Sequence, residues 1–297
     1  MAVFAVVHLV TSPGAFDALG PLADQVGKSG ALCLSLAPDR GRTVIVDQYW
    51  RIPLQVLPPS YQDADDEAYV YLLNPTGGVV QGDRLRTDVT LMPGARSVMT
   101  TQSASKIYRM DDSYAEELNR YTLHGDAVLE CVPDQTIPFA GSRFHRATRV
   151  DLDPASTLIL TDLLAAGRVA RGERFAFERL FVEVDVRIAD ERLMLDRLNL
   201  APGDGAPDRL GLWNGHAYYG TLYAYSPCLD ATVADALAEV VERRGDVYGS
   251  AGRPAPGCAI VRVLARTTWQ VREVIFETWD LLRRNLLDKP ARELRKL

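Results

Sequence analysis

The 297-residue sequence has little of the two side chains that most often build covalent or metal-bound frameworks. It has four cysteines and four histidines. The cysteines are far apart in the chain: Cys33, Cys131, Cys228 and Cys258. A disulfide scaffold of this size needs more cysteines, and a structural zinc site needs closely spaced ones. The scarcity favours buried, reduced thiols in a cytoplasmic protein.

The sequence also lacks a long apolar run and an excess of basic residues. The apolar start, residues 1–10, has no basic segment and is about half as long as a membrane span. The formal net charge is −6, and the arginines are spread along the chain. Because nucleic acids and anionic membranes attract basic surfaces, we expect neither as a partner.

Familiar catalytic motifs are missing as well. The histidines are scattered, with no H-x-x-x-H pair, and no G-x-S-x-G elbow occurs. Ser103–Lys106 matches S-x-x-K, but the partner motifs of that enzyme class are absent, so a structural lysine is the better interpretation. The sequence therefore predicts no catalytic residues and a protein that is not an enzyme.

A glycine-rich segment, GGVVQGDR at Gly77–Arg84, has the outline of a phosphate-binding loop but not its chemistry. Asp83 stands where such a loop has lysine, and its charge would repel phosphate. Residues 85–91 then alternate apolar and polar as a strand does, whereas a phosphate loop opens a helix. We predict a tight turn that needs glycine at positive φ and that aims Asp83 at an interior or an interface.

Most of the chain has the pattern of strands. Residues 1–30, rich in glycine, proline and alanine, are expected to be a partly ordered N-terminal extension, and residues 31–297 a single domain. Turn signals recur in similar settings at 93–95, 125–127 and 153–155, with no long helical segment between them. This recurrence predicts a mainly β fold with an elongated, layered, β-helix-like structure. A plain β-sandwich is the alternative.

Two helices are predicted near the C-terminus, at about 228–245 and 268–287. The second carries an aromatic cluster of Trp269, Phe276 and Trp279. The apolar spacing alone favours packing of this cluster against the β body. The alternative is an exposed helix face that docks on a partner.

Nine segments between about residues 32 and 287 occur in an order that is typical of one protein family. They are GRTVI (41–45), PLQV (53–56), YLLNPTGGVVQGDRL (71–85), TTQSASKIYRM (100–110), LECVPDQTIPFAGS (129–142), LTDLLAAGRVARGERFAF (160–177), LDRLNL (195–200), VRVL (261–264) and LLRRNLL (281–287). Together they resemble the urease accessory proteins of the UreD family, called UreH in some organisms. The sequence departs from the family pattern at Gln81, where glycine is usual, and also at Ser105, Thr161 and Asp162.

The resemblance implies a scaffold rather than a catalyst. Family members form a complex with UreF, which binds the GTPase UreG, and the assembly docks on apo-urease and delivers Ni²⁺. The resemblance implies no tightly bound cofactor, only Ni²⁺ in transit through an internal water-filled passage, and a homodimer of the accessory complex is one option. The terminal helix is then expected to contact UreF through Trp269, Phe276, Trp279 and Arg283.

A passage for Ni²⁺ has to admit the ion and release it. Clusters of cysteine and histidine would retain the ion, whereas spaced carboxylates and water hold it weakly. The carboxylates expected along the passage lie within the matched segments and are Asp83, Asp162, Glu173 and Asp196. The alternative is that these acids only brace neighbouring arginines, namely Arg84, Arg168, Arg174 and Arg197.

Two other functions stay open. An all-β chain with many carboxylates could be a carbohydrate-active hydrolase that uses two acids, which predicts an exposed groove lined with aromatic residues. Aromatic residues make up only 8% of the sequence, and no pair of acids stands out at catalytic spacing. The second alternative is an adaptor protein with no role in metal delivery.

Overall fold

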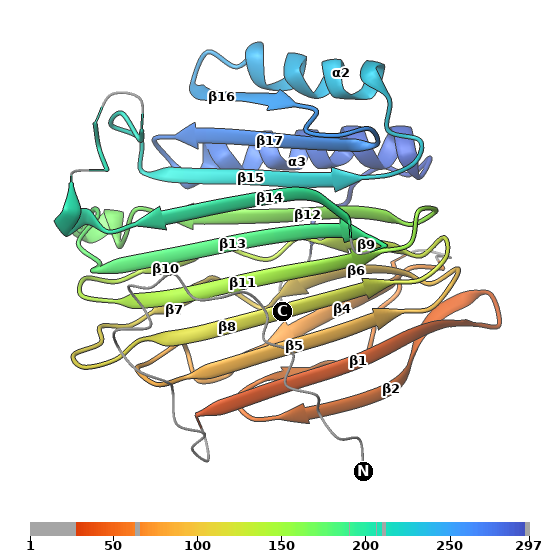
Figure 1. The fold of residues 1–297 in the computed structure, drawn as a ribbon, viewed down its shortest axis with the longest axis horizontal. Helices are drawn as coiled ribbons and strands as arrows, with labels where there is room; N and C mark the ends of the chain where they lie inside the picture. Colours follow the sequence, from red (N-terminus) through yellow and green to blue (C-terminus); the bar gives the residue numbers. More distant parts are fainter. Residues whose placement is uncertain (1–27, 63–65, 190, 206, 210–211, 295–297) are drawn as a thin grey trace.

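The computed structural model describes residues 28–62, 66–189, 191–205, 207–209 and 212–294. Two β-sheets face each other, and two helices lie on the outer side of one of them (Figure 1). The expected N-terminal extension falls almost wholly outside the described residues, and Ser29 already begins the first strand. The mainly β fold class is confirmed.

One sheet has seven strands and the other has ten. The seven-stranded sheet has the order β14 (Glu191–Leu200), β13 (Arg179–Ile188), β11 (Arg143–Leu152), β8 (Ala115–Leu123), β5 (Arg84–Leu91), β1 (Ser29–Asp39) and β2 (Arg42–Arg51). The ten-stranded sheet has the order β16 (Val247–Gly252), β17 (Cys258–Ala265), β15 (Tyr218–Tyr225), β12 (Thr157–Ala165), β9 (Val128–Cys131), β6 (Arg96–Thr101), β4 (Ala68–Leu73) and β3 (Gln55–Val56). Its remaining strands are β10 (Thr136–Pro138), which pairs with β12, and β7 (Ser105–Ile107), which pairs with β10. Two short 3₁₀ helices are η1 (Val169–Arg171) and η2 (Pro202–Asp204).

The chain passes back and forth between the two sheets as it proceeds. Strands β4, β6, β9 and β12 of one sheet alternate along the chain with β5, β8, β11 and β13 of the other, and each set pairs in parallel. Parallel neighbours need a crossover connection, and here the strand in the facing sheet is part of that connection. The result is a solenoid-like stack, as the β-helix-like prediction expected, rather than a plain sandwich.

The three recurring turn signals stack on one another at one end of the solenoid. The N–H of Gly94 donates to Oδ1 of Asp126 over 2.7 Å, and the N–H of Gly125 donates to Oδ2 of Asp153 over 2.7 Å. Each aspartate therefore belongs to one turn and holds the glycine of the turn before it. Both glycines have positive φ, 77° at Gly94 and 58° at Gly125, which other residues adopt at a cost. We call this arrangement the turn ladder.

Removing either aspartate of the turn ladder should weaken the stack of rungs. We expect Asp126→Ala and Asp153→Ala each to lower the free energy of unfolding by about 1 kcal/mol, because each leaves a glycine N–H without its charged acceptor. Urea unfolding measures the loss, with Asp112→Ala, at an exposed aspartate outside the ladder, as the control. Equal midpoints for the ladder variants and the control would contradict this role.

The two predicted helices are present, as α2 (Ala231–Glu242) and α3 (Thr268–Leu286). Asp230 caps α2 by accepting a hydrogen bond from the N–H of Val233 over 3.0 Å, and Thr267 and Gln270 form a capping box at the start of α3. Both helices pack against the outer face of the ten-stranded sheet, over β15, β16 and β17 (Figure 1).

Hydrophobic clusters fill the two ends of the space between the sheets. At the end with the turn ladder, neighbouring strands place four leucines in register: Leu36, Leu91, Leu123 and Leu152. The opposite end is filled by a cluster that includes Leu85, Ala115, Phe144 and Leu180. Between these clusters the strands β5, β8 and β11 carry inward-facing polar side chains, and that interruption defines the candidate site.

A candidate ion passage between the sheets

A band of polar side chains crosses the interior between the two hydrophobic clusters. One row of neighbours in the seven-stranded sheet is Thr87, Asn119 and Thr148. The next row contains Glu117 and Arg146, which are direct partners across β8 and β11. Alternation along a strand points these residues to the same face as the buried leucines, so they face the other sheet. We call this set the polar band.

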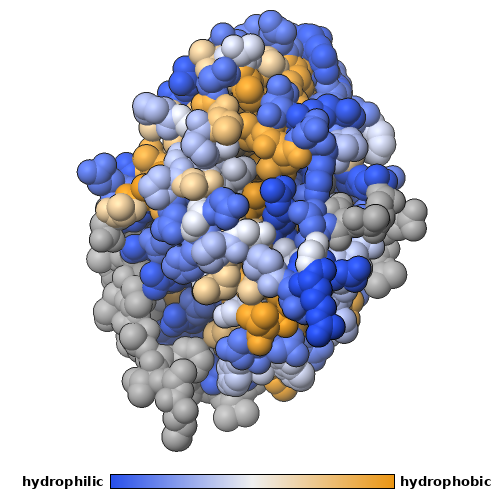
Figure 2. Space-filling model, turned by 90° about the vertical axis from the view of Figure 1, so that its right-hand side faces the viewer, coloured by the Kyte–Doolittle hydropathy of each residue, from blue (hydrophilic) through white to orange (hydrophobic). Residues whose placement is uncertain are grey.

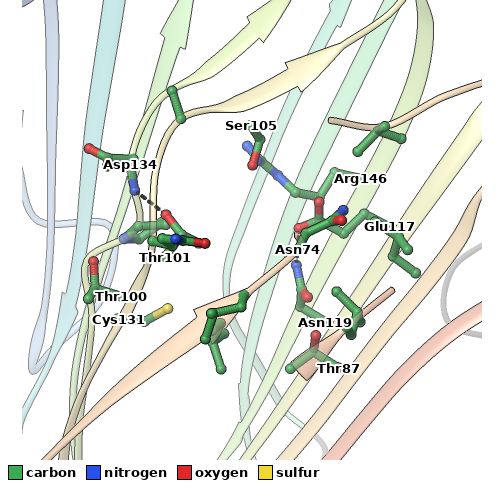
Figure 3. Close-up of a pocket in the computed structure, with 18 of the residues that line it drawn as sticks. Asn74, Thr87, Thr100, Thr101, Ser105, Glu117, Asn119, Cys131, Asp134 and Arg146 are labelled. Carbon is green, nitrogen blue, oxygen red and sulfur yellow. Dashed lines mark hydrogen bonds between the residues drawn. The ribbon is translucent and has the colours of Figure 1, made fainter. Parts of the chain in front are cut away.

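A cavity of about 160 Å³ lies in the polar band. In Figure 3, Thr87, Glu117, Asn119 and Arg146 from the seven-stranded sheet lie across the cavity from Cys131 of the ten-stranded sheet. Within the polar wall, the amide of Asn119 donates to Oε1 of Glu117 over 2.9 Å. The cavity is thus a polar space enclosed by two sheets, and such spaces in proteins hold water.

The mouth of the cavity is built from two of the segments that carried the family resemblance. Gly77 of the glycine segment and Gln102, Ser103 and Lys106 of the following segment line it and are exposed. The backbone joins the two segments, because the N–H of Val79 donates to the carbonyl of Lys106 over 2.8 Å. The predicted structural lysine therefore lies at the entrance to the cavity.

The glycines at the mouth have two different roles. Gly77 and Gly82 have φ values of 79° and 81°, as the predicted tight turn requires. Gly78 is needed for space instead, since a Cβ at this position would lie 2.5 Å from the carbonyl oxygen of Lys106 and 2.5 Å from the ring of Tyr108.

Gln81, which replaces the usual glycine of the family pattern, has an evident structural role. Its Oε1 accepts the backbone N–H groups of Asp111 and Asp112 over 2.7 and 3.0 Å. Its own carbonyl accepts from Nζ of Lys28 over 2.9 Å. The side chain thereby ties the glycine segment to the turn that follows β7.

Arg146 in the cavity wall is held in place by side-chain hydrogen bonds to Asp162 and Thr136. Its Nη2 donates to both carboxylate oxygens of Asp162 over 2.5 and 2.6 Å, and its Nη1 donates to Oγ1 of Thr136 over 2.8 Å. Burial lowers the pKa of Arg146, but the charges of Asp162 and Glu117 outweigh it and leave the pKa above its ordinary value. Asp162 is the one predicted passage carboxylate that lines the cavity.

Polar side chains also lie beyond the cavity, toward the edge of the seven-stranded sheet, although Val184 of β13 lies between Thr148 and Asp196. The hydroxyl of Tyr223 donates to Oδ2 of Asp196 over 2.9 Å, and Arg262 pairs with the same oxygen at 2.9 Å. Burial, followed by the charges of Asp196 and Asp162, raises the pKa of Tyr223 well above its ordinary value. Asp196 on β14 therefore lies beyond the cavity, at the edge of the seven-stranded sheet.

The other two predicted carboxylates lie away from the band. Asp83 is buried in the glycine segment, where it accepts the N–H of Val80 over 2.9 Å and pairs with Lys28 at 3.6 Å. Glu173 pairs with Arg168, and this contact lowers the pKa of Glu173. Neither is among the cavity-lining residues, so the structure does not bring the four carboxylates together.

The arginine partners also differ from those expected by the bracing alternative. Only Glu173 pairs with one of the four arginines that the sequence suggested, and that arginine is Arg168 rather than the adjacent Arg174. Asp83, Asp162 and Asp196 pair instead with cations from distant strands or from before β1, namely Lys28, Arg146 and Arg262. Sequence neighbours are poor guides here because cross-strand partners come from separate rungs.

The four residues of α3 that are predicted to contact a partner differ in their exposure to solvent. Trp269 and Phe276 are 70% and 40% exposed, whereas Trp279 and Arg283 are 2% and 1% exposed. Nε1 of Trp279 donates to Glu130 over 2.5 Å, and Arg283 pairs with Glu130 at 3.1 Å. Trp279 and Arg283 thus lie beneath the helix in the core, whereas Trp269 and Phe276 are exposed, and contact of the four with a partner stays a prediction.

Among the described residues, no group of three or more histidine, cysteine, aspartate or glutamate side chains could hold a metal ion. No helix in the described part of the chain is long and apolar enough to cross a membrane. In the cavity itself, the charges of Arg146 and Asp162 are paired with each other.

Sequence reasoning missed Glu117, Asn119, Arg146 and Thr148 as site residues. A signal for them exists, because each occupies the inward phase of a strand that is otherwise apolar on that face. The signal becomes convincing only when the strands are aligned, since the polar positions then fall side by side.

Comparisons with known proteins agree on one family. A family model described as UreD urease accessory protein matches residues 28–296. The chain is 34% identical to the urease accessory protein UreD of Actinomyces naeslundii, over 90% of this chain and 98% of the relative. It is 35% identical to UreD 2 of Streptomyces griseus, over 94% and 97%, and 34% identical to UreD of Haloarcula marismortui, over 91% of each.

Proposed function

The chain belongs to the UreD family of urease accessory proteins, and we propose that it is a maturation scaffold through which Ni²⁺ passes to apo-urease. Membership supports a role in urease maturation. The observation that carries the finer proposal is the polar band, which begins at an exposed mouth and contains a cavity, with Asp196 beyond it at the edge of the seven-stranded sheet.

The chemistry of the band suits an ion that must move on. Oxygen ligands from a few separated carboxylates, threonines and amides hold Ni²⁺ more weakly than clustered imidazoles or thiolates do. Conduction requires a site that favours entry yet allows exit. Asp162 in the cavity and Asp196 beyond it are the two carboxylates that would hold the ion in this way. Asp83 and Glu173 are better explained as braces of loops.

The exposed part of α3 is the proposed contact surface for UreF, with UreG reached through UreF. Trp269 and Phe276 are the large aromatic side chains that α3 exposes, and aromatic anchors contribute strongly to protein interfaces. On the end of the molecule that carries the turn ladder, hydrophobic residues gather in the upper part, at the level of the helices (Figure 2). A partner that covers the helices would bury surface of this kind.

The two alternatives receive less support. A two-acid hydrolase needs an open groove with aromatic residues, but the cavity is enclosed by two sheets and the aromatic residue that lines it is Tyr121. A simple adaptor would give no reason for a polar band in the interior, where apolar side chains contribute more to stability.

Blocking the cavity should abolish nickel delivery without preventing assembly. We expect Thr148→Phe to place a ring in the cavity, to cost about 1–3 kcal/mol in stability and to reduce urease activation more than roughly tenfold. Thr122→Phe, on the outer face of β8, is the matched control. The assay is nickel-dependent urease activity in a strain that lacks the native gene and carries each variant.

Assembly is measured in parallel by co-purification with UreF and UreG. Replacing Trp269 and Phe276 by serine should reduce both co-purification and activation, whereas Thr148→Phe should reduce activation alone. Normal activation by a folded Thr148→Phe protein would disprove passage through the cavity. Loss of its co-purification would show that the residue is structural.

A further inference from the structure

Arg146 lies across the path that the polar band offers to an ion. It starts from β11 in the seven-stranded sheet and reaches Asp162 on β12 in the ten-stranded sheet. This ion pair therefore bridges the two walls of the cavity. On one side are Glu117 and the mouth, and on the other are Tyr223 and Asp196. An ion that travels along the band has to pass the guanidinium of Arg146, which is already bound to the carboxylate of Asp162.

Resting on the proposed function, we propose that Arg146 is a tethered cation that competes with a passing divalent cation for Asp162 and so keeps the cavity from retaining that cation. When the divalent ion arrives, it replaces the guanidinium at the carboxylate, and the guanidinium stays inside the cavity. When Arg146 returns to Asp162, the ion is released along the band. The exchange is one cation for another at the same oxygens and involves no covalent step.

The charges of the cavity wall support this competition. The formally charged side chains of its lining are three acidic and two basic ones: Glu117, Asp134, Asp162, Lys106 and Arg146. The formal charge is therefore −1, and a bound divalent ion changes it to +1. Without Arg146 the charge would be −2, and a divalent ion would neutralise it. In a partly enclosed space, the lining without Arg146 should therefore retain a divalent ion better than the native lining does. The native lining with the ion bound carries excess positive charge, and like charges close together are costly.

When a divalent ion displaces the guanidinium of Arg146 from Asp162, another hydrogen-bond acceptor lies nearby. Glu117 is the direct neighbour of Arg146 across β8 and β11, and its charge acts on Arg146 already. Thr136 holds the other end of the guanidinium at 2.8 Å. Arg146 can therefore turn from Asp162 toward Glu117 without leaving charged or hydrogen-bonded surroundings. A monovalent ion would gain no more at Asp162 than the arginine does, so the arrangement favours divalent ions.

Removing the positive charge of Arg146 should make the cavity retain Ni²⁺. The test compares the full-length wild-type chain, Arg146→Gln, Arg146→Lys and Arg149→Gln, where Arg149 lies on the same strand but pairs with Asp151 on the outer face. Each protein, purified with its UreF and UreG, is equilibrated with Ni²⁺ alone and desalted, and the retained metal is measured. We expect Arg146→Gln to bind Ni²⁺ at least roughly tenfold more tightly than the other three.

A double variant, Arg146→Gln with Asp162→Asn, restores the formal charge of −1 and should return retention to the wild-type level. Equal retention by a folded Arg146→Gln protein and the wild type would overturn the proposal. This readout is separate from urease activation. If Thr148→Phe leaves activation normal, the passage itself is disproved, whatever Arg146→Gln retains.

A second measurement uses the wild-type chain and so does not depend on a variant that folds. Ni²⁺ is paramagnetic, and even brief visits to Asp162 should broaden the side-chain Nε–H NMR signal of Arg146 in an arginine-labelled sample. The signal of Arg149, on the other face of the sheet, should broaden much less. Equal broadening of the two signals, or none at either, would overturn the competition.

Discussion

Replacing Arg283 by methionine is expected to lower the free energy of unfolding by about 3–5 kcal/mol. The guanidinium is 1% exposed and pairs with Glu67 at 2.8 Å and with Glu130 at 3.1 Å, and both acids are also about 1% exposed. Without it, two buried carboxylates lose their main counter-charge, although Lys289 still reaches Glu67 at 3.2 Å. Urea unfolding and thermal melting measure the loss, with a melting shift on the order of 10 °C.

The loss from Arg283→Met should depend on pH. Burial raises the pKa of Glu130 to about 7, and the charge of Arg283 lowers it from a still higher value. The variant should therefore protonate Glu130 at a higher pH than the wild type does. Because a protonated carboxyl tolerates burial, the deficit should be smaller at pH 5 than at pH 8. A deficit that grows as the pH falls would contradict this account.

The neighbouring residue is a matched control for Arg283. Arg284 pairs with Asp280 at 2.7 Å on the exposed face of α3, with 60% of its side chain accessible to solvent. Such exposed pairs contribute about 0–1 kcal/mol, so Arg284→Met should unfold close to the wild-type midpoint. Similar losses for the two variants would mean that helix propensity, rather than the buried ion pairs, holds α3 in place.

A methyl group at Gly78 is expected to cost about 2–3 kcal/mol and to disturb the mouth of the cavity. The new Cβ would lie 2.5 Å from the carbonyl oxygen of Lys106, which is backbone and cannot move aside as a side chain can. The same oxygen accepts the N–H of Val79, so its displacement also weakens the link between the glycine segment and β7. Urea unfolding of Gly78→Ala measures the cost.

Gly77→Ala separates steric crowding from backbone strain. A Cβ at Gly77 meets no atom within 4 Å, and the penalty there comes only from its φ of 79°. We expect about 1 kcal/mol for Gly77→Ala. Gly77→Asn should cost less, because asparagine tolerates this region better than alanine does. If Gly78→Ala were no more harmful than Gly77→Ala, the close approach at the mouth would not be a constraint.

Local sequence signals predicted much of the fold. The inward residues of β5 alternate as expected, and the glycine and aspartate turns recur because each rung closes with the same backbone geometry. The helices were also located to within a few residues, since an N-cap such as Asp230 and the apolar spacing are local features. These properties depend on residues that are close in the chain.

The candidate site was harder to predict, because it depends on residues that are distant in the chain. Asp162 was identified, yet its partner Arg146 was not, and the polar row of Asn119 and Thr148 exists only after the strands are in register. The apolar spacing favoured packing of Trp279 against the β body, but the buried acid that Trp279 and Arg283 share was missed for a similar reason. Their acceptor Glu130 is 149 and 153 residues away in sequence.

The buried ion pairs of Arg283 beneath α3 bear on how the protein is made. Arg283 donates to Glu67 across 216 residues, so this buried acid, which directly precedes β4, has its main counter-charge only after α3 has been synthesised. Domains have a total stability of about 5–15 kcal/mol, and the missing pair is worth a large part of that. A nascent chain can therefore form its first rungs but cannot complete this part of its native state until α3 has been made. Prematurely terminated products should consequently be easy targets for cellular proteases.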